Sequence, residues 1–326
     1  ELSKADLTDK KELPGASLKV TDEDGNTVDE WVSKEEAHII KGLIVGKKYK
    51  MTETKPADGY VTAESIEFTV ENTKEVQKHQ MLDDVTKVEI SKKDITDSSE
   101  VPGAKLIILD KDGKKVESWT STDKPHMVEK LPVGEYTLRE EQAPDGYLIA
   151  EDVKFTVKDT GKVQKVKMKD AHPYGKLVIK KTDSTSKSAL SGAEFELREK
   201  ESGKVVEKLV TDKTGTATSG KIPIATYKNG KVEKTVEYIL VETKAPNGYE
   251  LSSKKEEIRF EYKDGKTKVI EIVKEIKNTK SPSGNTPTGN SPKTGDSTNI
   301  WLPILLAVLS ACGIGGVIWY KKKKGN

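Results

Sequence analysis

The chain has 326 residues with nearly balanced charge, 56 Lys and Arg against 54 Asp and Glu, and only 6% aromatic residues. Its length allows two or three domains with small cores, and the balanced charge gives no electrostatic reason to expect a nucleic-acid partner. The single cysteine, Cys312, excludes an intramolecular disulfide, so durability outside a cell would need another source.

The sequence repeats with a period of about 87 residues, which indicates a tandem array. Leu13-Pro14-Gly15-Ala16 returns as Val101-Pro102-Gly103-Ala104 and as Leu190-Ser191-Gly192-Ala193. We therefore expect three units, at residues 1–86, 87–173 and 174–280. The third unit is longer because it carries an insertion around residues 211–237. Only a few residues separate the units, so the array is expected to be stiff.

Apolar and polar residues alternate within each unit, as around Val88 and Ile90 or around Tyr136 and Leu138. Asp-Gly, Asn-Gly and Pro-Gly turns separate these short runs. A period of two predicts β-strands, and no long run with the helical period appears before the C-terminal segment. The predicted fold class is all-β: a tandem array of three small antiparallel β-sandwich domains, followed by one C-terminal transmembrane helix.

Each unit has three polar side chains at the ends of apolar stripes, where the alternation places them on the core face. They are Lys4, Glu53 and Asp83 in the first unit, Lys92, Glu140 and Asp170 in the second, and Lys181, Glu242 and Asn278 in the third. In the first two units Lys and Glu are 49 and 48 residues apart, and Glu and Asp are 30 apart in both. These groups can lie at strand ends and point to water, but their recurrence in all three units favours burial.

A buried, unpaired ammonium or carboxylate would be very costly. Burial lowers the pKa of a lysine and raises that of a carboxyl group, so a neutral amine can face a neutral acid or amide. Contact between the two gives a high effective concentration, and a protonated Glu beside them can polarise the acceptor carbonyl and move the proton. The predicted product is an amide between two side chains.

Two short motifs accompany these groups. The first strand of each unit carries Lys-x-Asp, as Lys4-Ala5-Asp6, Lys92-Lys93-Asp94 and Lys181-Thr182-Asp183. A Glu-x-x-x-Pro-x-Gly-Tyr box runs from Glu140 to Tyr147 and from Glu242 to Tyr249, while in the first unit Pro56 stands one residue early relative to Gly59-Tyr60. Residues 1–280 thereby resemble the B-type repeats of Gram-positive collagen adhesins, which are the CnaB, SpaA-like or prealbumin-like domains.

The resemblance implies one spontaneous intramolecular isopeptide bond in each unit. The implied pairs are Lys4–Asp83, Lys92–Asp170 and Lys181–Asn278. In each pair the lysine is the nucleophile and the Asp or Asn is the acceptor, while Glu53, Glu140 or Glu242 is the proton shuttle. The first two bonds would release water and the third ammonia.

The C-terminal segment predicts a spacer and then a membrane span. Residues 281–290 are rich in Ser, Pro, Gly, Asn and Thr, a composition that predicts a disordered, wall-spanning spacer. The uncharged run at 300–320 has 21 residues and is followed by Lys321–Lys324. As a helix it would be ~30 Å long, which matches a bilayer core, and the lysines would stay cytoplasmic.

Ser291-Pro292-Lys293-Thr294-Gly295 stands between the spacer and the span. Pentapeptide, apolar span and basic tail in this order resemble the cell-wall sorting signal of Gram-positive surface proteins, with Ser291 in place of the usual Leu, as in some clostridial signals. The resemblance implies that a sortase cuts between Thr294 and Gly295 and joins Thr294 covalently to peptidoglycan. The segment 296–326 would be removed, so the membrane would hold the chain only transiently.

No pattern in the sequence indicates a cofactor, a metal site or an enzyme that acts on external substrates. Calcium-binding loops that begin at Asp22 or Asp110 would need Glu at the twelfth position, which is occupied by Ser33 and Ser121. Hairpin turns are favoured at both places. Trp31 is interpreted as packing against a strand rather than stacking on a ligand, as is its counterpart in the second unit.

The sequence therefore predicts the stalk region of a secreted, wall-anchored surface adhesin. We expect it to be part of a longer protein, because a secretory signal and a separate binding region are not found in it. The expected partners are a sortase and peptidoglycan. Two alternatives remain open: the repeats themselves bind a host extracellular matrix protein such as collagen or fibronectin, or the chain is part of a pilus subunit.

Overall fold

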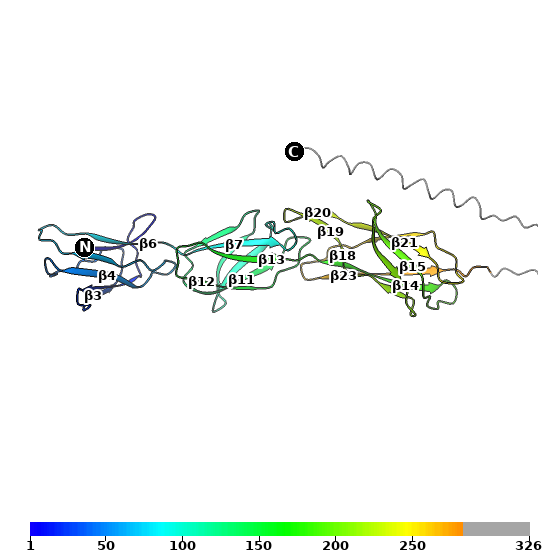
Figure 1. Cartoon of the computed structure of the whole chain (residues 1–326), viewed down its shortest axis with the longest axis horizontal. Helices are drawn as coiled ribbons and strands as arrows, with labels where there is room; N and C mark the ends of the chain where they lie inside the picture. Colours follow the sequence, from blue (N-terminus) through cyan, green and yellow to red (C-terminus); the bar gives the residue numbers. More distant parts are fainter. Residues whose placement is uncertain (283–326) are drawn as a thin grey trace, which may run out of the picture. The chain divides into compact units, whose positions relative to one another are not determined.

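The computed structural model describes residues 1–282, which contain β-strands and no helix. Residues 1–281 form one compact unit, in which the strands gather in three separate groups (Figure 1). In this described part of the chain there is accordingly no helix long and apolar enough to cross a membrane. The predicted spacer beyond residue 282, the pentapeptide 291–295 and the span 300–320 lie outside the described residues.

The first repeat has two sheets. Its strands are β1 (Leu2–Asp6), β2 (Ser17–Asp22), β3 (Thr27–Val32), β4 (Lys48–Lys55), β5 (Ile66–Thr69) and β6 (His79–Asp83). One sheet has the antiparallel order β3-β2-β4-β5. The other consists of β1 and β6.

The second repeat has the same plan with one more strand. Its strands are β7 (Lys87–Asp94), β8 (Lys105–Asp110), β9 (Lys115–Thr120), β10 (His126–Glu129), β11 (Gly134–Gln142), β12 (Val153–Val157) and β13 (Gln164–Asp170). The two sheets have the orders β12-β11-β8-β9 and β10-β7-β13. The turn between β8 and β9 is a hairpin in which the Asp110 carboxylate accepts hydrogen bonds from backbone amides, and the β2–β3 turn is built in the same way around Asp22.

The third repeat carries the insertion as extra strands. Its strands are β14 (Tyr174–Asp183), β15 (Glu194–Glu199), β16 (Val205–Val210), β17 (Thr216–Thr218), β18 (Ile222–Pro223), β19 (Ala225–Lys228), β20 (Lys231–Thr235), β21 (Glu237–Lys244), β22 (Lys255–Arg259) and β23 (Val269–Asn278). One sheet has the order β16-β15-β21-β22, and in the other β14 pairs with β17, β18 and β23. Strands β19 and β20 form a separate hairpin.

One apolar core lies between the two sheets of each repeat, as the alternation predicts. In the second repeat it includes Val88 and Ile90 from β7, Leu138 from β11 and Met168 from β13, all buried. Equivalent clusters fill the first and third repeats. The all-β class is thus confirmed for the described residues.

One strand pair in each repeat departs from the expected antiparallel order. The first and last strands of each repeat, β1 with β6, β7 with β13 and β14 with β23, lie side by side and run parallel. A parallel pair needs a long crossover connection, and here the rest of the repeat supplies it. This pairing brings the two ends of each repeat into contact along their full length.

Candidate site: a buried lysine triad in each repeat

The nine predicted side chains form three clusters, one inside each repeat. In the second repeat the Lys92 Nζ contacts Asp170 Oδ1 and lies 2.9 Å from Glu140 Oε2. In the first repeat the Lys4 Nζ contacts Asp83 Oδ1 and lies 2.9 Å from Glu53 Oε1. The structure therefore brings the members of each predicted triad into direct contact.

All nine side chains are buried, and the lysines are the most unusual of them. Lys4, Lys92 and Lys181 are 1%, 2% and 0% exposed, although lysine is almost never fully buried. The interpretation that these groups point to water is therefore wrong. A buried ammonium with two carboxyl groups around it carries a large desolvation cost, which a neutral arrangement would avoid.

The parallel first and last strands place the lysine beside its acceptor. Lys92 is level with Met168, and Asp94 is level with Asp170, so the acceptor lies two residues further along the neighbouring strand. Lys4 and Asp83, and Lys181 and Asn278, have the same offset in their strand pairs. Because side chains two apart share one face of a strand, the long lysine side chain reaches diagonally to the acceptor within the core.

The glutamate of each triad comes from the facing sheet. Glu140 lies on β11 opposite Leu106, and a β-bulge follows it; the pairing of β2 with β4 beside Glu53 and of β15 with β21 beside Glu242 is also irregular. Bulges re-aim side chains and are common next to reactive sites. Each carboxyl group contacts the lysine across the core.

A backbone amide in the loop ten residues later holds each glutamate in place. The amides of Ala63, Ala150 and Ser252 donate hydrogen bonds of 2.7, 2.7 and 2.9 Å to the Oε2 atoms of Glu53, Glu140 and Glu242. These contacts cannot be recognised in the sequence, because a backbone amide leaves no trace in residue identity. Only their spacing of ten residues from the glutamate is common to the three repeats.

Burial changes the protonation of the acceptor aspartates. Burial, together with the nearby Glu53 or Glu140 carboxyl, raises the pKa of Asp83 and of Asp170 from 3.8 to about 7, against the opposing effect of the lysine. The second carboxyl oxygen of each, Oδ2, is buried with no hydrogen-bond partner among the described residues. A proton shared with the adjacent glutamate would satisfy that oxygen, as a neutral acid requires.

The third repeat achieves the same arrangement with an amide. The Asn278 Nδ2 donates to both oxygens of Glu242, at 2.9 and 3.1 Å, while its Oδ1 contacts the Lys181 Nζ. Lys181 lies 3.2 Å from Glu242 Oε1, and burial lowers the pKa of its ammonium group. In each repeat an amine, an acceptor carbonyl and a carboxyl group are therefore in contact in a dry core. This is the geometry for acyl transfer from the acceptor to the amine.

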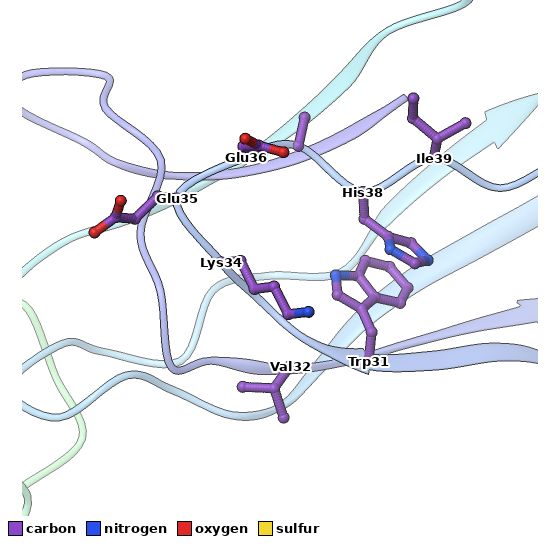
Figure 2. Close-up of a pocket in the computed structure, with 8 residues that line it drawn as sticks. Trp31, Val32, Lys34, Glu35, Glu36, His38 and Ile39 are labelled. Carbon is purple, nitrogen blue, oxygen red and sulfur yellow. The ribbon is translucent and has the colours of Figure 1, made fainter.

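The tryptophans of the first two repeats, Trp31 and Trp119, pack against the core of their own repeat. Figure 2 shows the Trp31 indole under the His38 ring, with ring centroids 4.2 Å apart, beside a surface pocket of about 820 Å³. Trp119 and His126 stack in the same way, with centroids 4.4 Å apart. The packing interpretation is thus supported at both positions. Residues 1–282 contain no group of three or more metal-ligating side chains.

Comparisons with known proteins identify the repeats. The SpaA family, described as a prealbumin-like fold domain, matches residues 1–84, 86–172 and 175–276. No curated protein matches the chain. Among solved structures, the Bacillus anthracis TIE protein is 28% identical over 86% of this chain, with a TM-score of 0.55. The chain spans 50% of the length of that structure.

Two major pilins also match over 86% of the chain. BcpA of Bacillus cereus is 19% identical, with a TM-score of 0.46, and the match takes in 98% of the BcpA chain. SpaD of Corynebacterium diphtheriae is 17% identical, with a TM-score of 0.39, and the match takes in 96% of the SpaD chain. Since the three family matches together take in most of the sequence, the chain belongs to the SpaA family of prealbumin-like fold domains and contains three of them in succession.

Proposed function

We propose that the chain is the stalk region of a cell-wall-anchored Gram-positive surface adhesin, and that an isopeptide bond closes each of its three repeats. The observation that carries this proposal is the threefold recurrence of a fully buried lysine against an Asp or Asn acceptor and a Glu. One such contact could be a structural ion pair. Three in equivalent positions, in a chain whose only cysteine is Cys312, indicate a common covalent device.

The proposed reaction is intramolecular and happens once in each repeat. The neutral lysine Nζ attacks the acceptor Cγ, an N–C bond forms, and the C–O bond of Asp83 or Asp170 breaks. The glutamate carries one amine proton to the leaving oxygen, which departs as water. In the third repeat the C–N bond of Asn278 breaks instead, and ammonia departs. No external substrate is turned over.

The bond would make each repeat resistant to pulling. It joins the first strand to the last, so force that enters at one and leaves at the other bypasses the hydrogen-bonded interior. The linked residues are 79, 78 and 97 positions apart. Closing loops of this size would also stabilise each repeat by ~4–5 kcal/mol through chain entropy, treated like a disulfide.

We propose further that a sortase attaches the chain to peptidoglycan through Thr294 after cutting before Gly295. The support is the order of pentapeptide, apolar span and basic tail in the sequence. The segment 300–320 would hold the precursor at the membrane until cleavage. The mature protein would then lie outside the cell, attached to its wall.

The experiment that tests the crosslinks is the intact mass of purified residues 1–280 under denaturing conditions. The expected mass is lower than calculated by two water molecules and one ammonia. The variants Lys4→Arg, Lys92→Arg and Lys181→Arg should each restore one of these losses and leave the other two. If the wild-type chain has the full calculated mass, with no water or ammonia lost, the isopeptide proposal is refuted.

The two alternative functions predict different observations. If the repeats bind a host matrix protein, residues 1–280 should bind immobilised collagen or fibronectin. If the chain is a pilus subunit, as the SpaA-family domains also permit, it should appear in high-mass polymer ladders on the cell surface. If the chain is a stalk, neither result is expected. Wall-digesting enzyme should instead release the protein as single copies.

A further inference from the structure

Two residues of the sequence motifs have no part in the proposed crosslink. They are the Asp of Lys-x-Asp and the Tyr of Pro-x-Gly-Tyr, and within each repeat the Tyr hydroxyl donates to that Asp. The distances are 2.8 Å for Tyr60 to Asp6, 2.8 Å for Tyr147 to Asp94 and 2.9 Å for Tyr249 to Asp183. The same Asp–Tyr pair is therefore built three times, at the same place in each repeat.

The pair holds a negative charge in a buried position. Asp6, Asp94 and Asp183 are buried. Burial raises the pKa of Asp6, but hydrogen bonds from the Thr8 amide and the Tyr60 hydroxyl outweigh this effect and hold the pKa at about 2. A buried carboxylate with one Tyr partner retains capacity to accept further hydrogen bonds, and it attracts a cation or a polar ring.

At the first junction a lysine of the next repeat occupies this pair. The Lys130 Nζ lies 2.6 Å from the Tyr60 hydroxyl, 3.4 Å from Asp6 Oδ2 and 4.8 Å from the centre of the Tyr60 ring. Its backbone lies so close to Gly59 that a Cβ there would be 2.4 Å from the Lys130 oxygen. The glycine of the motif thus allows the next repeat to approach.

At the second junction aromatic rings occupy the pair. The His172 Nε2 lies 2.9 Å from Asp94 Oδ2, and its ring stacks on Tyr227 of the β19–β20 hairpin with centroids 3.4 Å apart and an angle of 2°. Tyr227 also meets the edge of Tyr147 and donates a 2.8 Å hydrogen bond to the Gly146 oxygen. The hairpin that is inserted in repeat 3 therefore reaches the pair of repeat 2.

We propose that the Asp–Tyr pair is a docking socket through which each repeat holds the one that follows, and that the β19–β20 insertion exists to fill the second socket. The first socket, Asp6–Tyr60, takes Lys130 as a point charge. The second, Asp94–Tyr147, takes the His172–Tyr227 stack, in which Tyr227, the residue supplied by the next repeat, carries no charge. The two junctions should therefore differ in stiffness and in their response to salt.

Spin-label distances can test the two sockets separately. Each repeat has an exposed position on an outer strand that can carry a label. These positions are Glu30 on β3, Ser118 on β9 and Lys208 on β16, and each strand is paired to a core strand of its own repeat. Residues 1–281 form a compact unit and contain no cysteine. Glu30→Cys with Ser118→Cys reports the first junction, and Ser118→Cys with Lys208→Cys the second, by double electron–electron resonance.

Lys130→Ala should broaden the first distance distribution and leave the second as in the wild type. Tyr227→Ala should broaden the second alone, and so should His172→Ala, which leaves the hairpin sequence intact. The exposed neighbours supply matched controls: Glu129→Ala and Lys231→Ala should change neither distribution. At ~1 M salt, where charges are screened within about 3 Å, the first distribution should broaden more than the second.

Unchanged widths in Lys130→Ala and in both second-junction variants would overturn the proposal. So would equal broadening of both distributions by either variant, since that would mean a global effect. The isopeptide bonds are measured by mass and do not enter this result, so a failure here is distinct from a failure of the crosslinks.

Discussion

Glu140→Ala is the sharpest test of the role proposed for the glutamates. The Glu140 carboxyl lies 2.9 Å from the Lys92 Nζ and is held by the Ala150 amide at 2.7 Å. The substitution removes this carboxyl group and leaves the nucleophile and the acceptor in place. If Glu140 carries the proton, Lys92 and Asp170 should stay unlinked, while repeats 1 and 3 still close.

The expected loss of stability follows from the span of the missing crosslink. Lys92 and Asp170 are 78 positions apart, and a loop of that length corresponds to about 4.5 kcal/mol of chain entropy. For a domain of this size, that loss corresponds to roughly 20–35 °C in melting temperature. The unlinked Lys92–Asp170 pair would remain buried without its third partner, which adds to the loss.

Intact mass and calorimetry together measure both consequences. The mass of the variant should exceed, by one water molecule, the mass calculated for the same variant with all three bonds formed. One of the thermal transitions should shift to a lower temperature. Glu141→Ala, which changes the exposed neighbour on the same strand, should keep the full mass loss and all transitions. If Glu140→Ala loses its water at the normal rate, Glu140 is not the proton shuttle.

Three further predictions address the acceptors and the anchor. In Lys92→Met no bond can form in repeat 2. The pKa of Asp170 is raised from 3.8 to about 7 even with Lys92 beside it, so without that lysine the folded carboxyl keeps a proton that the unfolded chain has lost. Urea unfolding of repeat 2 in this variant should therefore show stability falling as the pH rises from about 4 past 7, a slope that the linked wild type lacks; equal slopes would contradict the crosslink. Asn278→Asp should give a mature mass identical to that of the wild type, because both acceptors yield the same lysyl amide; masses that differ by the substitution would mean that the bond in repeat 3 does not form. Thr294→Ala should leave the protein extractable by detergent, whereas the wild type should need wall-digesting enzyme; wild-type protein in the detergent fraction with Lys321–Lys324 still attached would indicate a plain membrane anchor.

The sequence determined the strands and which side chains face the core. Alternation decides the face of a strand, because successive side chains point to opposite sides, and the repeat shows which alternations correspond. This was enough to select Lys92, Glu140 and Asp170 as buried neighbours in an otherwise apolar interior. The roles of these residues in a reaction remain predictions.

Only the tertiary structure decided how distant segments meet. That β7 and β13 are parallel and adjacent depends on the path of the intervening strands, which periodicity does not specify. The Ala150 amide that holds Glu140 has no identity in the sequence. The docking of Lys130 and Tyr227 depends on surface shape and charge at the ends of folded repeats. Local pattern thus determines which side chains fill each core. Contacts between loops and between repeats depend on the shape of the folded repeats, because the alternation of a strand does not constrain them.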